Sequence, residues 1–153
     1  MNIDYTKISR VGDFVPTSEF VVGSDGSITG FVGYQPSVGA IWVVFRGSSD
    51  IENWITNFDF VRQSYPLSGC GGCSVHEGFY QAEQQAIQRI ASAVSSLRNT
   101  HPNYQIVVAG HSLGAALATL TALDLAVTYG YGSGVSVYNY GSPRIFNENG
   151  ANF

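Results

Sequence analysis

The chain has 153 residues, of which 44% are hydrophobic and only 12% are charged. This length predicts one domain, and the hydrophobic fraction suits a folded core. The formal net charge is −4 and no cluster of Lys or Arg occurs, so we expect neither nucleic acid nor an anionic surface to bind through charge. The sequence predicts no transmembrane segment, and its first ten residues lack the apolar core of a secretory signal.

Runs of β-branched and aromatic residues predict the strands, and apolar residues at helical spacing predict the helices. In chain order we expect strands at 19–23, 27–35 and 40–47, helices at 51–58 and 77–98, a strand at 104–110, a helix at 113–129 and a strand at 135–141. The first two strands suit a hairpin. The alternation of strands and helices from residue 40 onward predicts an α/β fold with a mostly parallel sheet and flanking helices.

Residues 106–120, IVVAGHSLGAALATL, place Ser112 between two glycines, directly after an apolar strand and directly before a helix. A nucleophile elbow needs this context, because its serine sits on a very sharp strand-to-helix turn. The flanking glycines allow the two backbones to approach each other. Ser112 is therefore the candidate nucleophile. The alternative is a serine that only caps a buried helix.

An elbow of this kind stabilises the oxyanion with two donors. One is the backbone N–H of the residue after the nucleophile, here Leu113, and the other comes from the loop after an earlier strand. Ser48 follows the strand at 40–47 and is the candidate for the second donor. The alternative is that Ser48 only begins the next helix.

Four segments of the sequence resemble the fungal-type, or class 3, lipases in order and in spacing: FRGSSDIENW, VHEGF, GHSLGAALATL and YNYGSPR. The resemblance runs from about residue 19 to the last residue and loosens at Phe146, where the family usually has glycine. It implies an α/β-hydrolase fold and hydrolysis of carboxylic esters, typically triacylglycerols or related lipid esters. It places Ser112 as the nucleophile and Ser48 and Leu113 in the oxyanion hole.

The helix expected near residues 50–58 matches the lid of these lipases, which covers the site in water and opens at a lipid–water interface. The apolar face that would cover the site consists of Ile51, Trp54, Ile55 and Phe58. Such a face could also lie on a lipid surface. The alternative is a short helix packed permanently on the core.

The pair Cys70 and Cys73 lies in a glycine-rich loop, and the sequence offers no second Cys pair or nearby His pair to complete a metal site. We therefore expect no metal, and ester hydrolysis requires no cofactor. Some secreted members of the resembled family carry a disulfide at a matching position, and the resemblance implies a Cys70–Cys73 disulfide and secretion. An oxidising compartment favours this pairing.

A serine nucleophile needs a base, and in α/β-hydrolases an acid and then a histidine follow the serine along the chain. After Ser112 the sequence has Asp124 and Glu148 as its only acids and no histidine. Asp124 falls inside a helix, and Glu148 comes before the expected position of the acid. Upstream lie three histidines, none of them expected to be the base: His76, His101 and His111.

We therefore expect residues 1–153 to form a single but partial lipase domain, truncated at both ends. The family's leading helix and the C-terminal part of the fold, with the acid and the base, are expected to be missing. The first interpretation is an ester hydrolase of the lipase type. The alternative is a non-catalytic lipase-like domain that binds lipid or a partner. A third interpretation is an esterase whose histidine comes from another chain. The sequence does not predict the oligomeric state.

Overall fold

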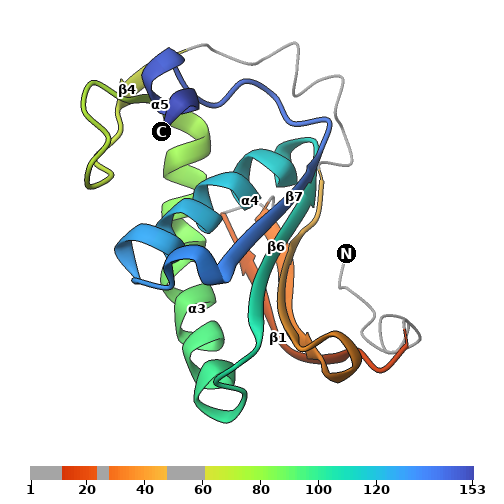
Figure 1. Ribbon diagram of the computed structural model, residues 1–153. Helices are drawn as coiled ribbons and strands as arrows, with labels where there is room; N and C mark the ends of the chain where they lie inside the picture. The colour runs from red at the N-terminus through yellow and green to blue at the C-terminus, as the bar shows by residue number, and fades with distance from the viewer. Residues whose placement is uncertain (1–11, 24–27, 48–60) are drawn as a thin grey trace.

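The computed structural model describes residues 12–23, 28–47 and 61–153 (Figure 1). Several expected site residues lie outside the described residues, namely Ser48 of the oxyanion hole and Ile51, Trp54, Ile55 and Phe58 of the lid. The roles expected for these five residues remain predictions.

The central sheet has five strands in the order β1-β2-β3-β6-β7. Their bounds are Val15–Val22 for β1, Ile28–Gln35 for β2, Ala40–Phe45 for β3, Gln105–His111 for β6 and Val135–Tyr140 for β7. Strand β2 pairs antiparallel with both β1 and β3, whereas β3, β6 and β7 pair in parallel. Four strands thus run in one direction and β2 runs against them. This arrangement confirms the predicted α/β fold, its mostly parallel sheet and its first hairpin.

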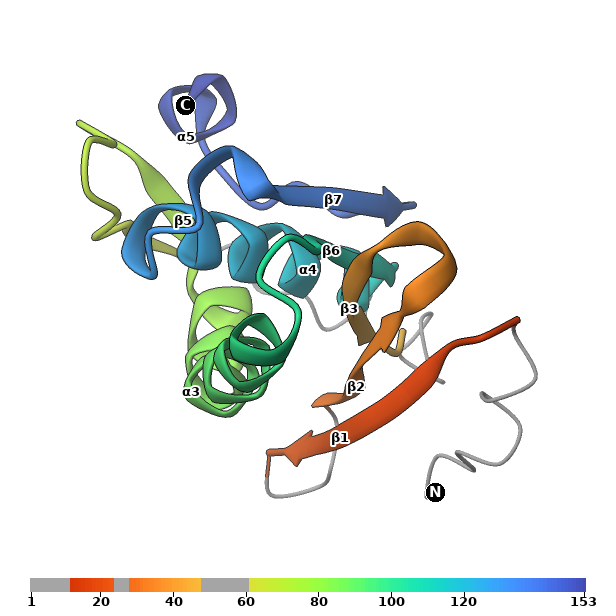
Figure 2. The same ribbon diagram turned by 60° about the horizontal axis from the view of Figure 1, so that its bottom comes forward.

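Two helices lie together on one side of this sheet (Figure 2). Helix α3 spans Glu77–Thr100, and α4 spans Leu113–Leu123. Beyond α4 the chain continues as a π-helix, η2, over Asp124–Thr128, so the helix expected over 113–129 changes its hydrogen-bond pattern after Leu123. The short helices are η1 at Pro36–Val38, η3 at Gly132–Gly134 and α5 at Glu148–Asn152.

The core forms where α3 and α4 pack on the sheet. The sheet contributes Val32, Ile41, Val43 and Val108, and the helices contribute Phe79, Ile90, Leu117 and Leu120, all at most 1% exposed. Full burial of one such side chain contributes about 1.5–3 kcal/mol relative to exposure. The buried face of α3 differs from the expected apolar stripe at one turn, because Glu83 is fully buried. A carboxyl group inside the core is a feature that the apolar spacing does not predict.

A small second sheet carries the cysteine loop. Strands β4 (Arg62–Ser64) and β5 (Ser74–His76) pair antiparallel, and Cys70 and Cys73 form a disulfide between them with a Cα–Cα distance of 5.5 Å. The disulfide implied by the family resemblance is therefore present. Both cysteines are at least 92% buried.

The C-terminal residues are fastened to this cysteine loop through Asn147. The Asn147 side chain accepts hydrogen bonds from the backbone N–H groups of Ser74 at 2.9 Å and Gly150 at 3.1 Å, and it donates to the carbonyl of Gly72 at 3.0 Å. The N–H of Asn147 in turn donates to the carbonyl of Ser74 at 3.1 Å. Because one side chain satisfies three backbone groups from two distant segments, it determines how the tail lies on the loop.

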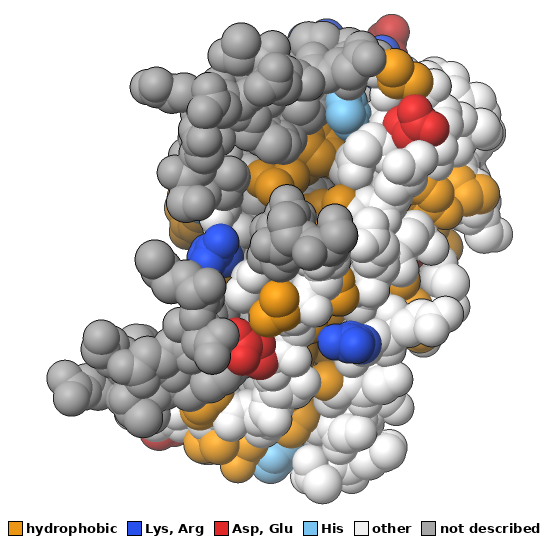
Figure 3. Space-filling view, turned by 180° about the vertical axis from the view of Figure 1, so that it is seen from behind, with side chains coloured by type: hydrophobic (Ala, Val, Ile, Leu, Met, Phe, Trp, Pro, Cys, Tyr) orange, Lys and Arg blue, Asp and Glu red, His pale blue; other side chains and the backbone are white. Residues whose placement is uncertain are grey.

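The described surface carries few charges. In the view from behind, single Arg, Asp and Glu side chains are scattered among uncharged ones (Figure 3). This distribution fits the low charged fraction of the sequence. None of the helices in the described part of the chain is both long enough and apolar enough to cross a membrane.

Replacement of Asn147 by alanine should loosen the tail from the cysteine loop. The change removes three hydrogen bonds and leaves a partly buried N–H of Ser74 without its acceptor. We therefore expect the free energy of unfolding to fall by about 2 kcal/mol. Amide hydrogen exchange should increase at Ser74 and over residues 145–150 and stay unchanged in β6. The control is Asn149→Ala, which removes a single bond to Gly72. Equal effects of the two variants would contradict the role given to Asn147.

Candidate active site

The candidate site lies where the carboxyl ends of three parallel strands meet. Gly110 of β6 is in register with Phe45 of β3 and with Asn139 of β7. Ligands of open parallel sheets bind at this end of the strands, because the loops that leave it can converge on one point. Ser112 lies between the end of β6 and the start of α4, just beyond this edge.

Ser112 has a backbone conformation that side chains rarely adopt. Its φ is 55° and its ψ is −123°, and it is the one non-glycine residue with positive φ among those the structure describes. A residue held in such a region costs on the order of 1–3 kcal/mol, so the surroundings must fix it. One fixing contact is a 2.9 Å hydrogen bond from the Ser112 N–H to the carbonyl of Tyr140, at the end of β7. The strained turn predicted for a nucleophile elbow is therefore present.

Two glycines allow this turn. A Cβ at Gly110 would lie 2.1 Å from the carbonyl oxygen of Gly114, a distance that no side chain tolerates. A Cβ at Gly114 would lie 2.8 Å from the carbonyl oxygen of Arg46 and 3.0 Å from that of Phe45. The first glycine thus permits β6 and α4 to approach each other, and the second permits α4 to approach the end of β3.

The start of α4 points backbone N–H groups at the turn. The N–H groups of Ala115 and Ala116 both donate to the carbonyl of Ser112, while the first N–H groups of any helix have no acceptor within it. Leu113 is the first residue of α4 and is 9% exposed. Its N–H lies in the part of the helix where the dipole favours negative charge. The oxyanion role expected for Leu113 stays a prediction, and its place at the start of α4 is compatible with it.

The loop after β3 lies against the elbow. A Cβ at Gly47 would lie 3.0 Å from the carbonyl oxygen and 3.5 Å from Nδ1 of His111. Ser48 follows Gly47 directly, although Ser48 itself is outside the described residues. Gly47 is a residue of this region that was not predicted from the sequence. In the sequence, its position directly before Ser48, a candidate oxyanion donor, could have indicated that it belongs to the site.

Each of the three histidines has contacts of its own among the described residues, and none of these contacts is with the Ser112 hydroxyl group. His76 is buried, and its Nδ1 accepts a 3.4 Å hydrogen bond from the N–H of Phe79 at the start of α3. His101 stacks on Tyr104, with ring centroids 4.6 Å apart, just after the end of α3. The ring of His111 lies beside Gly47 and Gly141, which belong to the loops after β3 and β7.

The two acids that follow Ser112 also lie away from the turn. Asp124 is at the far end of α4, about 16 Å along the helix by the usual rise per residue. There Thr128 and Gln84 donate hydrogen bonds to it, and burial raises the pKa of its carboxyl group. Glu148 lies in α5, which packs on β5. Within the described ranges no three residues of the metal-binding types His, Cys, Asp and Glu come together as a possible metal site.

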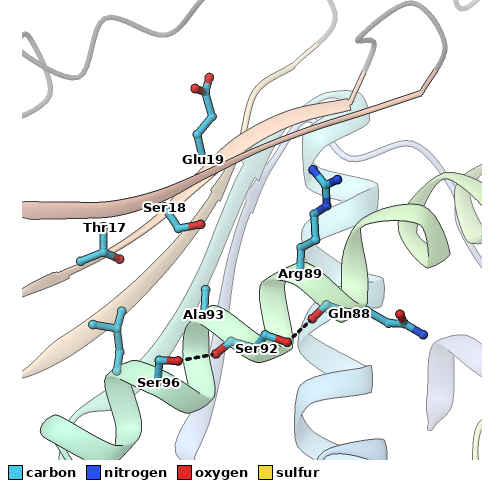
Figure 4. Close-up of a pocket in the computed structure, with 9 residues that line it drawn as sticks. Thr17, Ser18, Glu19, Gln88, Arg89, Ser92, Ala93 and Ser96 are labelled. Atoms are coloured by element: carbon cyan, nitrogen blue, oxygen red, sulfur yellow. Dashed lines mark hydrogen bonds between the residues drawn. The ribbon is translucent and has the colours of Figure 1, made fainter.

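A groove of about 650 Å³ lies between β1 and α3 (Figure 4). Most of the residues that line it are polar, among them Thr17, Gln88 and Arg89, and none belongs to the β6–α4 turn. The hydroxyl groups of Ser92 and Ser96 donate to carbonyls of their own helix, as Figure 4 shows. The groove is thus separate from the candidate site.

The chain matches the family model for lipase (class 3) over residues 42–153. It is 40% identical over 133 residues to secreted mono- and diacylglycerol lipase 1 of Fusarium solani, covering 87% of this chain and 38% of that protein. A solved mutant form of MDLA from Penicillium cyclopium superposes with a TM-score of 0.85 at 31% identity, covering 97% of this chain and 53% of that one. A triacylglycerol lipase whose catalytic centre is described as a serine protease triad gives 0.80 at 34% identity, covering 92% and 52%.

Substitution of Gly110 by alanine should destabilise the fold through the β6–α4 contact. The new methyl group would have to displace the carbonyl of Gly114, and overpacking of this kind costs about 3 kcal/mol. Urea unfolding measures the loss. The control is Gly134→Ala, since a Cβ at Gly134 meets nothing within 4 Å. If Gly110→Ala were as stable as this control, the close approach described above would be wrong.

Proposed function

Because the chain belongs to the class 3 lipase family, we propose that it provides the nucleophile of a serine ester hydrolase that acts on acylglycerols. The observation that carries this proposal is the strained conformation of Ser112 between β6 and α4. The names of relatives support the substrate class, since one is a mono- and diacylglycerol lipase and another is a triacylglycerol lipase. The chain spans about two fifths of the length of the curated relatives it matches, so the activity is proposed for the complete protein.

In the proposed reaction the Ser112 hydroxyl attacks the ester carbonyl, and its proton passes to a histidine base. The backbone N–H of Leu113 and the Ser48 donor stabilise the negative charge that develops on the carbonyl oxygen. The alcohol leaves with the proton, and water then hydrolyses the acyl-enzyme by the same steps. We assign the acid and the base to residues outside these 153. A triad is supported by a relative, a triacylglycerol lipase whose catalytic centre is described as a serine protease triad. The reaction requires no metal and no organic cofactor.

The same proposal includes a lid and secretion. The apolar residues expected on the helix near 50–58 give it a surface for a lipid–water interface. The relatives from Fusarium and Penicillium are named as secreted, and the disulfide between Cys70 and Cys73 suits an oxidising compartment. The lipid ester substrate and the interface are the partners proposed.

A second candidate is a lipase-like domain that binds lipid or a partner without turnover. The favouring observation is that the Ser112 side chain makes no capping hydrogen bond. His76 instead accepts a hydrogen bond from Phe79, and His101 stacks on Tyr104. An unassisted serine is a weak nucleophile. The two candidates differ in one property, the reactivity of Ser112 in the complete natural polypeptide.

Labelling with a fluorophosphonate probe tests the proposed function. A serine assisted by a base should be labelled at Ser112 within minutes, and Ser112→Ala should abolish the signal. General-base assistance accelerates such steps by roughly 10²–10⁴-fold, so the two candidates are well separated. Ser142→Ala is the control, because this serine lies in the loop after β7 and its hydroxyl donates to the carbonyl of Pro143. Absence of labelling, together with binding of a fluorescent fatty-acyl probe, would favour the binding domain.

Replacement of Trp54 by alanine tests the proposed lid. Loss of this large apolar side chain should lower activity on emulsified ester by roughly tenfold, from the free energy of burying one such group at an interface. Activity on a short, soluble ester should stay close to that of the wild type. Equal losses on both substrates would contradict the lid and favour a helix packed permanently on the core.

A further inference from the structure

A buried pair of carboxyl groups joins α3 to the end of α4, away from the candidate active site. Glu83 of α3 is fully buried, and Asp124 at the start of η2 is 8% exposed. The side-chain amide of Gln84 lies between them, donating to Glu83 Oε2 at 2.9 Å and to Asp124 Oδ2 at 3.1 Å. One nitrogen therefore bridges the two carboxyl groups, and α3 and η2 are fastened through it.

Hydroxyl groups complete the contacts of the pair. Thr121 of α4 donates to Glu83 Oε1 at 3.4 Å, and Thr128 of η2 donates to Asp124 Oδ1 at 3.1 Å. We refer to this cluster as the carboxyl latch, and its members are Glu83, Gln84, Thr121, Asp124 and Thr128. The latch closes across the point where the α-helical hydrogen bonds of α4 change to those of the π-helix.

The titratable groups that face Glu83 are acids and tyrosines. They are Asp124 from η2, Tyr129 just after η2, Tyr80 from α3 itself and Tyr65 from the loop after β4. The Tyr65 side chain is 4% exposed, its hydroxyl has no hydrogen-bond partner, and burial followed by the charges of Asp124 and Glu83 raises its pKa. Among the described residues no basic side chain contributes to the electrostatic environment of Glu83. Two ionised carboxylates would thus share a buried space without a positive charge.

Such an arrangement favours one neutral carboxyl group, since burial and a like charge both oppose ionisation. Glu83 is the better candidate for the proton. It is more deeply buried than Asp124, and its hydroxyl donor is the more distant one, at 3.4 Å against 3.1 Å. In agreement, burial and then the charge of Asp124 raise the pKa of Glu83 to about 8.

We propose that the carboxyl latch is a proton-controlled device: α3 closes on α4 and η2 while Glu83 is protonated, and loss of that proton to alkaline solvent loosens the junction. The proton leaves the Glu83 carboxyl for solvent base, and the resulting carboxylate faces Asp124 across the Gln84 amide. This inference does not depend on the proposed esterase activity, because it concerns the stability of the helix pair.

The direction of the pH effect follows from the pKa difference. The ordinary pKa of a glutamate is 4.5, and the folded protein raises that of Glu83 to about 8. Between these values the folded state holds a proton that the unfolded state has lost, so the contribution of Glu83 to stability falls as pH rises and levels off above the higher value. Replacement of Glu83 by glutamine, which keeps the shape and has no charge, should remove this dependence.

The first test is urea unfolding of the complete natural polypeptide from about pH 5 to about pH 9. The folding equilibrium constant of the wild type, divided by that of Glu83→Gln, should fall by more than about tenfold over this range. The matched control is Glu77→Gln on the same helix, whose carboxylate accepts an exposed hydrogen bond from Gln81. This control should follow the wild type. Parallel curves for the wild type and Glu83→Gln would overturn the proposal.

The second test observes the proton directly and covers the case in which Glu83→Gln does not fold. In protein labelled with ¹³C at glutamate carboxyl groups, one resonance should titrate with a midpoint near the value of about 8. Asp124→Asn should move that midpoint to lower pH, because it removes the neighbouring charge. If every glutamate resonance finished titrating below about pH 6, as ordinary glutamates do, the proposal would be wrong. The same conclusion follows if Asp124→Asn left the high midpoint unchanged.

Discussion

The close approach of β6 and α4 is the constraint on which the rest of the structure depends. Gly110 and Gly114 have no side chains, and the space that a Cβ of Gly110 would need is taken by the carbonyl of Gly114. A strand that turns into a helix within so short a distance forces positive φ on Ser112. The same approach presses the start of α4 on the carbonyls at the end of β3. One backbone contact therefore sets the serine, the direction of α4 and the distance to the loop that leads to Ser48.

Burial on both sides of the elbow makes this contact rigid. Strand β6 lies between β3 and β7, and α4 is buried along almost its whole length. Few polar groups enter such a core, because each needs a partner. Glu83, Thr121 and Asp124 are exceptions, and they occur together where α4 meets α3. Three of the six buried polar residues that the structure describes thus lie at the end of α4 that is opposite to Ser112.

The sequence predicts the features that are decided by residues close together along the chain. The period of apolar residues predicted α3, and the run around Val107 predicted β6, because neighbours along the chain decide both. Gly-His-Ser-Leu-Gly between a strand and a helix predicted the elbow for the same reason. The clamp of Asn147 on Ser74 joins residues 73 apart, and the bridge of Gln84 to Asp124 joins residues 40 apart. Pairings at such separations depend on how the elements pack, and a buried Glu83 at a helical position looks like any surface glutamate until α4 is placed beside it.

The nucleophile half of the candidate site is built from backbone. The turn at Ser112, the N–H of Leu113 and the carbonyl of Tyr140 that holds the turn all belong to the ends of β6, α4 and β7. Parallel pairing of the strands fixes these groups, so the position of the serine does not require the side chain of any base. The reactivity of the serine does require one. The position of Ser112 and the reactivity of its hydroxyl group are therefore separable properties of this fold. Only a measurement of reactivity distinguishes a hydrolase from a binding domain with the same elbow.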